Sequence, residues 1–193
     1  MKLSKYLLAT AIAAGLCSTA AQAADGTITF NGTVTNSACT IASVTADSVV
    51  GASPFNATLT LPSVTGNTLN AGAGTYAGQT PFSIQLTGCE ATAQLNNVRT
   101  LFTTTATPAG DAHVMANTAT SSPAADVAVA ILTPGGTQID LNGGAQVDPG
   151  LALPVAGSPG PLQLNYLAAY KSLGTTVTAG NVTGVADFVI SYY

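Results

Sequence analysis

The final residues of the chain, 186–193, alternate between apolar and polar side chains in the manner of a β-strand, and the sequence ends with them. A second alternating segment, residues 27–35, lies near the opposite end. A last strand at the edge of a sheet would leave backbone donors and acceptors unpaired, and proteins normally cover such an edge. The N-terminal segment could provide that cover to a neighbouring copy by strand addition. We therefore expect a β-protein that joins to copies of itself.

The first 23 residues have the organisation of an export signal. Lys2 and Lys5 precede an apolar stretch, residues 6–17, and the Ala-Gln-Ala sequence at 21–23 matches a cleavage site. The apolar stretch is shorter than the about 20 residues that a membrane-spanning helix needs. We expect residues 1–23 to be removed as a signal peptide, which leaves an exported mature chain without a membrane span.

Charged side chains are rare in the mature chain. Arg99 and Lys171 are its two basic residues, against eight acidic ones, for a net charge of −6. This charge disfavours nucleic acid as a partner, because binding the phosphate backbone requires a basic surface. Soluble proteins usually have roughly 25% charged residues, so this sparse charge favours a surface that is packed against other copies. An ordinary secreted β-domain with few charges is the alternative.

Two cysteines, Cys39 and Cys89, stay in the mature chain, because Cys17 lies in the signal segment. Two cysteines in an exported protein usually pair, and closing the loop between them would stabilise the fold by about 4 kcal/mol. A metal site built on them and His113 lacks the four ligands of a structural zinc site. We predict a Cys39–Cys89 disulfide, with no metal and no other cofactor.

Alternating β-branched residues, bounded by Gly, Pro and Asn, dominate the sequence and predict an all-β fold. Strands are expected at 27–35, 39–44, 57–64, 81–87, 98–105, 127–133, 137–141, 162–172 and 182–192. Residues 134–136, Pro-Gly-Gly, would form the turn of a hairpin. We interpret 107–125 as a surface loop and expect at most a short helical turn, near 68–74 or 91–95. Short strands at this spacing predict a single-domain β-sandwich.

The sequence contains little that catalysis would require. His113 is the one histidine, so a Ser-His-Asp site would depend on it entirely. No G-x-S-x-G elbow and no phosphate-binding loop is present. We interpret His113 as a solvated loop residue and expect neither catalytic residues nor enzyme activity. Phe82, Ile84 and Leu86, in alternation before Cys89, are interpreted as core.

Several sequence features follow one another in order along the mature chain. Residues 26–39 lead to the first cysteine, 80–89 lead to the second, 166–170 read Tyr-Leu-Ala-Ala-Tyr, and Gly180 precedes a closing strand with penultimate Tyr192. Together these features resemble the major subunits of type 1 fimbriae, which are pilins of the chaperone–usher pathway. The resemblance covers essentially the whole mature chain.

The resemblance implies an incomplete immunoglobulin-like β-sandwich, residues 37–193, which lacks its final strand and has an apolar groove beside the last one. A periplasmic chaperone would fill the groove first. At an outer-membrane usher, the N-terminal extension of another subunit, residues 24–36, would replace it as a donor strand. The product would be an extracellular filament of identical or related pilins that supports adhesion and biofilm formation.

Residues of the closing strand are implied to form the groove and the chaperone-recognition site: Gly180, Phe188, Ile190 and Tyr192. Tyr193 departs from the family pattern, because it makes the end of the chain doubly aromatic. This departure leaves open whether the penultimate tyrosine alone is recognised.

Alternate residues of the N-terminal segment share one face of a strand. That face presents Gly26, Ile28, Phe30, Gly32 and Val34, whereas the opposite face is polar. Burial of the three apolar side chains would contribute about 1.5–3 kcal/mol each. These five residues are therefore the expected groove-facing residues of the donor strand, and Gly32 would leave a shallow place where incoming and outgoing strands coexist.

Two further functions remain open on the sequence alone. The chain could be a minor or adaptor pilin of the same filament. It could also be a self-complemented exported β-sandwich binding protein, whose strand 27–35 closes its own sheet. A tip adhesin is disfavoured, because it would carry an extra lectin domain and would need no donor strand.

Overall fold

The computed structural model describes residues 39–45, 49–53, 56–143 and 147–193. All of these belong to one compact unit, Asn36–Tyr193. The expected signal peptide, 1–23, and donor strand, 24–36, lie outside the described residues, so both assignments stay predictions. Within the described ranges, no helix is long and apolar enough to cross a membrane.

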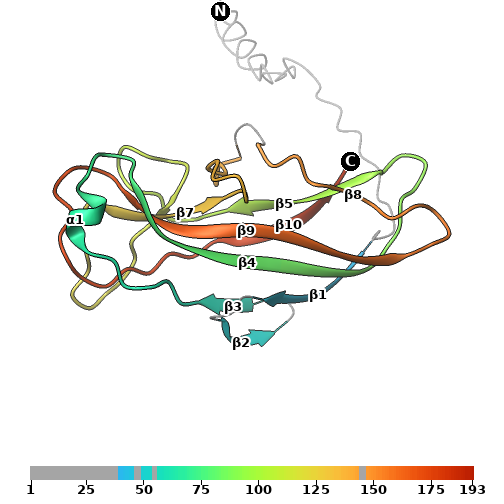
Figure 1. Ribbon diagram of the computed structural model, residues 1–193, viewed down its shortest axis with the longest axis horizontal. Helices are drawn as coiled ribbons and strands as arrows, with labels where there is room; N and C mark the ends of the chain where they lie inside the picture. Colours follow the sequence, from blue (N-terminus) through green and yellow to red (C-terminus); the bar gives the residue numbers. More distant parts are fainter. Residues whose placement is uncertain (1–38, 46–48, 54–55, 144–146) are drawn as a thin grey trace, which may run out of the picture. The chain divides into compact units, whose positions relative to one another are not determined.

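Two antiparallel sheets form the sandwich of this unit, a third, two-stranded sheet lies beside them, and the strands are labelled in Figure 1. The first sheet has the order β1-β4-β9-β7-β6 and the second the order β10-β5-β8. The strands of the first sheet are β1 (Thr40–Thr45), β4 (Tyr76–Cys89), β6 (Met115–Ala116), β7 (Val127–Leu132) and β9 (Gly160–Ser172). Those of the second are β5 (Asn97–Thr103), β8 (Leu151–Ala152) and β10 (Asp187–Tyr192). A hairpin of β2 (Val49–Ser53) and β3 (Asn56–Leu59) follows β1, and the short helix α1 (Gly66–Leu69) precedes β4.

The main core lies between the two sheets, and the alternation of side chains along each strand explains its composition. In β4 the buried residues include Ile84 and Leu86, and in β5 they are Val98, Thr100 and Phe102. The apolar ones among them belong to one cluster with side chains of β1, β7 and β9. Figure 1 shows the long strands β4 and β9 side by side along the length of the unit. The predicted all-β sandwich is confirmed.

The segment expected to be a surface loop, 107–125, is partly buried, and that prediction was wrong for its middle. Val114 and Met115 have exposed fractions of 0% and 5%, and β6 within this segment pairs with β7. Val114 packs against Ala128 and Ala130, on the face of β7 that points away from the main core. Single apolar residues among small polar ones have no periodicity, so the sequence pattern did not indicate this contact.

Residues 137–141 do not form the expected regular strand, although the turn before them is confirmed. The N–H of Gly136 donates to the carbonyl of Thr133 at 2.9 Å, and Gly136 has a φ of 82°, which glycine adopts readily. A single isolated bridge to β7 follows the turn. Leu141 is then buried, with 1% of its surface exposed, and its N–H donates to the carbonyl of His113 at 3.3 Å. The segment leaves β7 because Ile139 and Leu141 pack into the main core, and the carbonyl of Leu141 accepts a hydrogen bond from the N–H of Thr104 at 3.2 Å.

Two strands are several residues shorter than predicted, for different physical reasons. β3 ends at Leu59, before Pro62, which lacks the backbone donor that a sheet ladder needs. β10 begins at Asp187, because the carbonyls of Thr183 and Val185 accept hydrogen bonds from other loops instead of from a strand. β2, β6 and β8 have two to five residues each and were not predicted. The helical turn expected near residue 68 is present as α1 and begins at residue 66.

Candidate functional site

Two strands that border one groove have an unpaired edge within the described part of the chain. β1 pairs there with β4 alone, and β10 pairs with β5 alone. The groove that they border is lined in addition by residues 56–61, which include β3, and has a volume of about 790 Å³. Its apolar lining includes Ile41 and Val44 of β1, Phe82 of β4, Phe102 of β5, Ile131 of β7 and Phe188 of β10. Such a groove can accept an extended segment, which would bond to the strand edges and bury alternate side chains.

Three aromatic rings form and support the floor of the groove. The ring centroids of Phe82 and Phe102 lie 6.1 Å apart, and that of Tyr166 lies 4.9 Å from Phe102 and 5.7 Å from Phe82. Phe102 meets each of the other two rings edge to face, an arrangement that aromatic quadrupoles favour. Phe82 and Phe102 line the groove, whereas Tyr166 is 2% exposed and supports them from within the core.

The hydroxyl of Tyr166 is held by hydrogen bonds that join the two sheets. It donates to Oδ2 of Asp148 at 2.7 Å and accepts from the N–H of Thr100 at 3.3 Å. The other carboxylate oxygen of Asp148 accepts from the N–H of Gly150 at 2.9 Å. Burial, together with the adjacent Asp148 carboxylate, raises the pKa of Tyr166 well above its usual value. The phenol therefore stays protonated at neutral pH and continues to donate.

The inner face of β10 carries the three strand residues that the sequence singled out. Phe188, Ile190 and Tyr192 are half-buried and pack against the main core, and Phe188 also lines the groove. Val189, between them, is 63% exposed. The described residues therefore cover this apolar face incompletely, although the face points into the sandwich.

Gly180 lies apart from β10 and lines a second cavity of about 610 Å³. A Cβ at this position would lie 2.4 Å from the nitrogen of Ala124 and 2.5 Å from the carbonyl oxygen of Ser122. Glycine is therefore required for this close approach, where the N–H of Asn181 donates to the carbonyl of Ser122 at 2.8 Å. The structure gives Gly180 a packing role, and its role in chaperone recognition stays a prediction.

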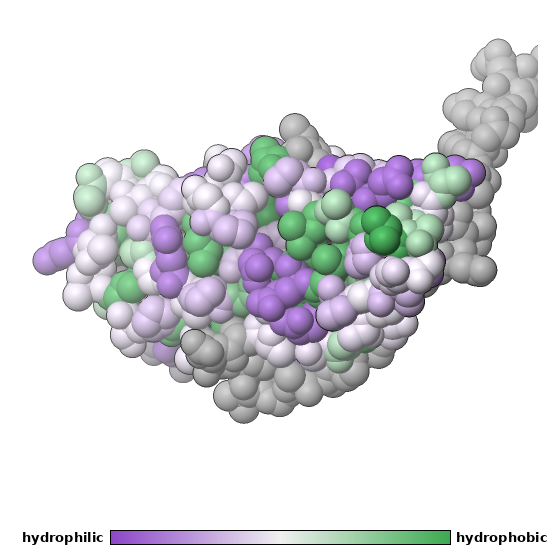
Figure 2. Space-filling model, turned by 45° about the vertical axis from the view of Figure 1, so that its right-hand side comes forward, coloured by the Kyte–Doolittle hydropathy of each residue, from purple (hydrophilic) through white to green (hydrophobic). Residues whose placement is uncertain are grey.

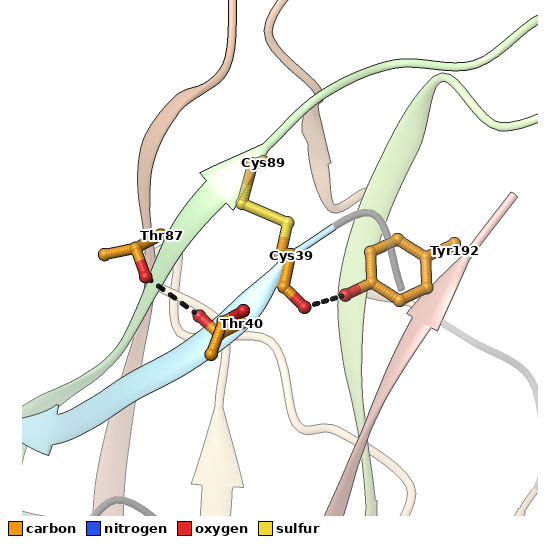
Figure 3. Close-up of a disulfide and its surroundings, with 5 residues drawn as sticks. All are labelled: Cys39, Thr40, Thr87, Cys89 and Tyr192. Carbon is orange, nitrogen blue, oxygen red and sulfur yellow. Dashed lines mark hydrogen bonds between the residues drawn. A yellow bond between two sulfur atoms is a disulfide. The ribbon is translucent and has the colours of Figure 1, made fainter. Parts of the chain in front are cut away.

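The predicted disulfide is present and ties β1 to β4 (Figure 3). Cys39, directly before β1, is bonded to Cys89, the last residue of β4. Beside it, the hydroxyl of Thr87 donates to the carbonyl of Thr40 at 3.4 Å. The hydroxyl of Tyr192 points at Cys39 and donates to its carbonyl at 3.5 Å, a long contact between the two sheet edges. This end of β1 is thus held to both β4 and β10.

Sequence reasoning assigned Phe82 to the core and missed its place in the groove. Ile84 and Leu86 are buried as expected, whereas Phe82 is half-buried and faces the groove. All three share one face of β4, so their alternation predicts the face correctly. Alternation in one strand does not indicate how much of that face the opposite sheet covers.

Charged contacts are few on the described surface. Nζ of Lys171 lies 2.6 Å from Oδ2 of Asp111, and Nδ1 of His113 lies 2.7 Å from Oδ1 of Asp140. The expectation that His113 is simply solvated was therefore incomplete: its side chain is 53% exposed but bonded to a carboxylate. On the face in Figure 2, most residues have intermediate hydropathy and strongly hydrophilic ones gather in a few clusters. The described residues contain no group of three or more His, Cys, Asp or Glu that could hold a metal ion.

Comparison with known proteins finds fimbrial proteins that match nearly the whole chain. A family model described as "Fimbrial protein" matches residues 28–193. The major fimbrial subunit SMF-1 of Stenotrophomonas maltophilia (strain K279a) is 36% identical over 175 residues, which cover 90% of this chain and 95% of that protein. The F17 fimbrial protein of Escherichia coli is 36% identical over 183 residues, 94% of each chain.

A solved structure shares the fold. The crystal structure of the P pilus rod subunit PapA aligns with a TM-score of 0.55 at 18% identity, and the alignment covers 81% of this chain and 100% of that one. With the family match over residues 28–193 and relatives that align over nearly their full length, the chain belongs to the fimbrial protein family and is a structural subunit of a fimbria.

Proposed function

We propose that the groove between β1 and β10 accepts a donor strand from a neighbouring subunit, and that the chain polymerises in this way into a surface filament. The observation that carries this proposal is an apolar groove bordered by two strand edges that have no partner within the described residues. A strand added there would gain ladder hydrogen bonds, each contributing about 0.5–1.5 kcal/mol net.

Residues 24–36 of another subunit have the pattern that this groove requires. A strand over 27–35 is about 30 Å long at 3.3 Å per residue. Its apolar face carries Ile28, Phe30 and Val34, which would meet the aromatic floor, while its threonine-rich face would remain in water. Gly26 and Gly32 complete that face at places where no side chain would enter the groove.

The apolar face of β10 needs a temporary cover before assembly, because exposed strand edges promote aggregation. We assign this role to a periplasmic chaperone that binds beside Phe188, Ile190 and Tyr192, with Gly180 as a further recognition residue. An outer-membrane usher would then catalyse replacement of the chaperone by the donor strand. The finished filament would lie outside the cell and support adhesion and biofilm formation.

A deletion and a peptide test this proposal together. Removing Ala24–Thr35 should leave a subunit that is captured by its chaperone but cannot join the preceding subunit. A synthetic peptide of residues 24–36 should bind the truncated subunit and raise its melting temperature by tens of degrees, because a whole strand is added to the core. Thermal unfolding followed by circular dichroism, with and without the peptide, measures this effect.

Matched peptide variants distinguish specific insertion into the groove from non-specific hydrophobic binding. Phe30→Asp should abolish the stabilisation, since an unpaired carboxylate in an apolar groove costs several kcal/mol. Thr29→Asp, on the opposite face, should retain most of it. A truncated subunit that is as stable as the full chain and gains nothing from the peptide would rule out a donor role. A full-length protein that remains a stable monomer with chaperone and usher present would instead favour the self-complemented sandwich.

A further inference from the structure

The outer face of the second sheet presents a surface that strand insertion would not cover. The residues that share this face in the register of β5 and β10 are Arg99, Leu101, Thr103, Asp187, Val189 and Ser191, and we call them the outer patch. Their neighbours along both strands point inward, as the burial of Val98 and Phe102 shows. A donor strand would bond to the edge of β10 and pack beneath it, so strand insertion by itself would leave the outer patch exposed.

The centre of the outer patch is apolar. Val189 lies directly opposite Leu101 in the antiparallel register, and such pairs share one face at close distance. Val189 is 63% exposed and Leu101 is half-buried. These two apolar side chains therefore lie at the centre of the outer patch, where a second protein surface could bury them.

The two charged residues of the outer patch lack charged partners within the described part of the chain. Arg99 and Asp187 take part in neither of the ion pairs there, which join Lys171 to Asp111 and His113 to Asp140. Nε of Arg99 is buried without a hydrogen-bond partner, and the guanidinium lies 4.5 Å from the ring centroid of Tyr193. The aromatic ring thus holds the guanidinium in one place without neutralising it.

The positions of these charges make the outer patch complementary to itself. Arg99 lies opposite Ser191, and Asp187 lies four residues before Ser191 on β10, about 13 Å along the strand. The Val189–Leu101 pair lies midway between the two charges. A two-fold axis in the plane of the contact and through this pair would place Arg99 of each copy over Asp187 of the other. It would also bring the two Val189 side chains together.

We propose that the outer patch binds a second copy of this chain around that two-fold axis, through two Arg99–Asp187 ion pairs and a central Val189 contact. Such a contact is isologous, because each copy uses the same surface. Subunits joined by donor strands within one filament all point the same way, so the contact would join subunits of two different filaments that lie side by side. Each contact is small, and its repetition along two filaments would strengthen the association.

Cross-linking of single-cysteine variants tests the two-fold geometry. Val189→Cys is compared with Val155→Cys, which replaces a valine that is 71% exposed and lies outside the outer patch. The native cysteines are bonded to each other, so a short bis-maleimide reacts with the added thiol alone. In purified filaments and in concentrated soluble subunit, Val189→Cys should form cross-linked dimers about tenfold faster than Val155→Cys. Equal rates would overturn the proposal.

Charge reversal in the Val189→Cys background tests the ion pairs. Arg99→Asp or Asp187→Arg alone should lower the cross-linking rate about tenfold, because like charges would face each other. The double variant, which restores opposite charges and the original net charge, should recover most of the rate. If Arg99→Asp lowers the melting temperature, the exposed Asp187→Arg variant decides alone. A rate unchanged by Asp187→Arg would refute the contact, as would a correctly folded double variant that does not recover.

Discussion

β7 and β10 are both six-residue strands rich in apolar side chains, yet they differ in burial and in strand pairing. All six residues of β7 are buried, and the strand has a hydrogen-bonded neighbour on each side, β9 and β6. No residue of β10 is fully buried, and within the described ranges its one neighbour is β5. Two strands of similar composition thus differ in their surroundings: β7 is buried and paired on both sides, whereas β10 is partly exposed and paired on one side within the described residues.

The difference lies in what covers each strand. On β7, Val129 and Ile131 face the main core, and Val114 covers the opposite face from the loop before the strand. On β10, Phe188 and Ile190 face the main core beside an open groove. The stability of β7 should thus depend on the chain alone, whereas that of β10 should depend on what enters the groove.

Loss of the disulfide should have the largest effect of the changes considered, and it should act mainly on β1, which borders the groove. Replacing Cys39 and Cys89 together with serine should lower the free energy of unfolding by about 4 kcal/mol, because the unfolded chain gains the freedom of a long loop. Amide hydrogen exchange should show early loss of protection in β1, whose one neighbour within the described residues is β4, while β7 keeps its protection longest. Equal loss of protection in β1 and β7 would contradict the comparison.

Truncation of one large side chain on each strand should show directly that the stability of β10, but not that of β7, depends on a filled groove. Leu132→Ala in β7 should lower the free energy of unfolding by about 2–5 kcal/mol whether or not the groove is filled, since Leu132 is already fully buried by the chain itself. Phe188→Ala in β10 should cost about 3–5 kcal/mol in the subunit filled by the 24–36 peptide, and clearly less in the empty one. Chemical denaturation of the Ala24–Thr35 deletion variant, with and without peptide, measures both. Equal costs for Phe188→Ala in the two states would show that the inserted peptide does not cover this residue.

The sequence predicted the inner face of β10, because alternation reports directly which side chains share a face. It predicted β7 as a strand but not its inner face, since all six residues of β7 are apolar and all are buried. It also predicted the disulfide, because export leaves two cysteines that pair. The burial of Val114 and the departure of residues 137–141 from β7 could not be predicted, since both depend on where a loop packs. The place of Phe82 in the groove was missed for a related reason. Its exposure depends on how much of the inner face of β4 the second sheet covers, and no pattern within β4 records that.

Tyr166→Phe should have an intermediate effect that does not depend on the groove. The change would leave Oδ2 of Asp148 and the N–H of Thr100 without the partner that the hydroxyl provides. The expected cost is about 1–3 kcal/mol, the usual penalty for unsatisfied buried groups. Because these bonds lie behind the groove floor, denaturation with and without the 24–36 peptide should give the same loss. A loss confined to the empty subunit would show that the floor is rigid only when the groove is filled.

The contact between Lys171 and Asp111 should produce the smallest effect, visible as a pH dependence. Burial alone would raise the pKa of Asp111, but the hydrogen bonds from Lys171 and from the N–H of His113 outweigh it and hold this pKa below its usual 3.8. A depressed pKa means that the folded state binds the proton less readily than the unfolded state. The stabilisation is therefore complete above pH 3.8 and is lost as the pH falls below that value towards the folded pKa.

The size of this contribution is about 0.5–1.5 kcal/mol, the usual net value of a hydrogen bond, because both side chains retain some contact with water, with 16% and 15% of their surface exposed. Lys171→Met should remove most of it, so the variant should lose less stability than the native chain when the pH is lowered from about 6 to about 2.5. Melting temperatures at both pH values, at one ionic strength, measure the difference. Lys171 belongs to β9 and pairs with Ala128 of β7, the strand that has a hydrogen-bonded neighbour on each side. The pH dependence should accordingly be the same with the groove empty or filled, and a change upon peptide binding would show that the two sides are coupled.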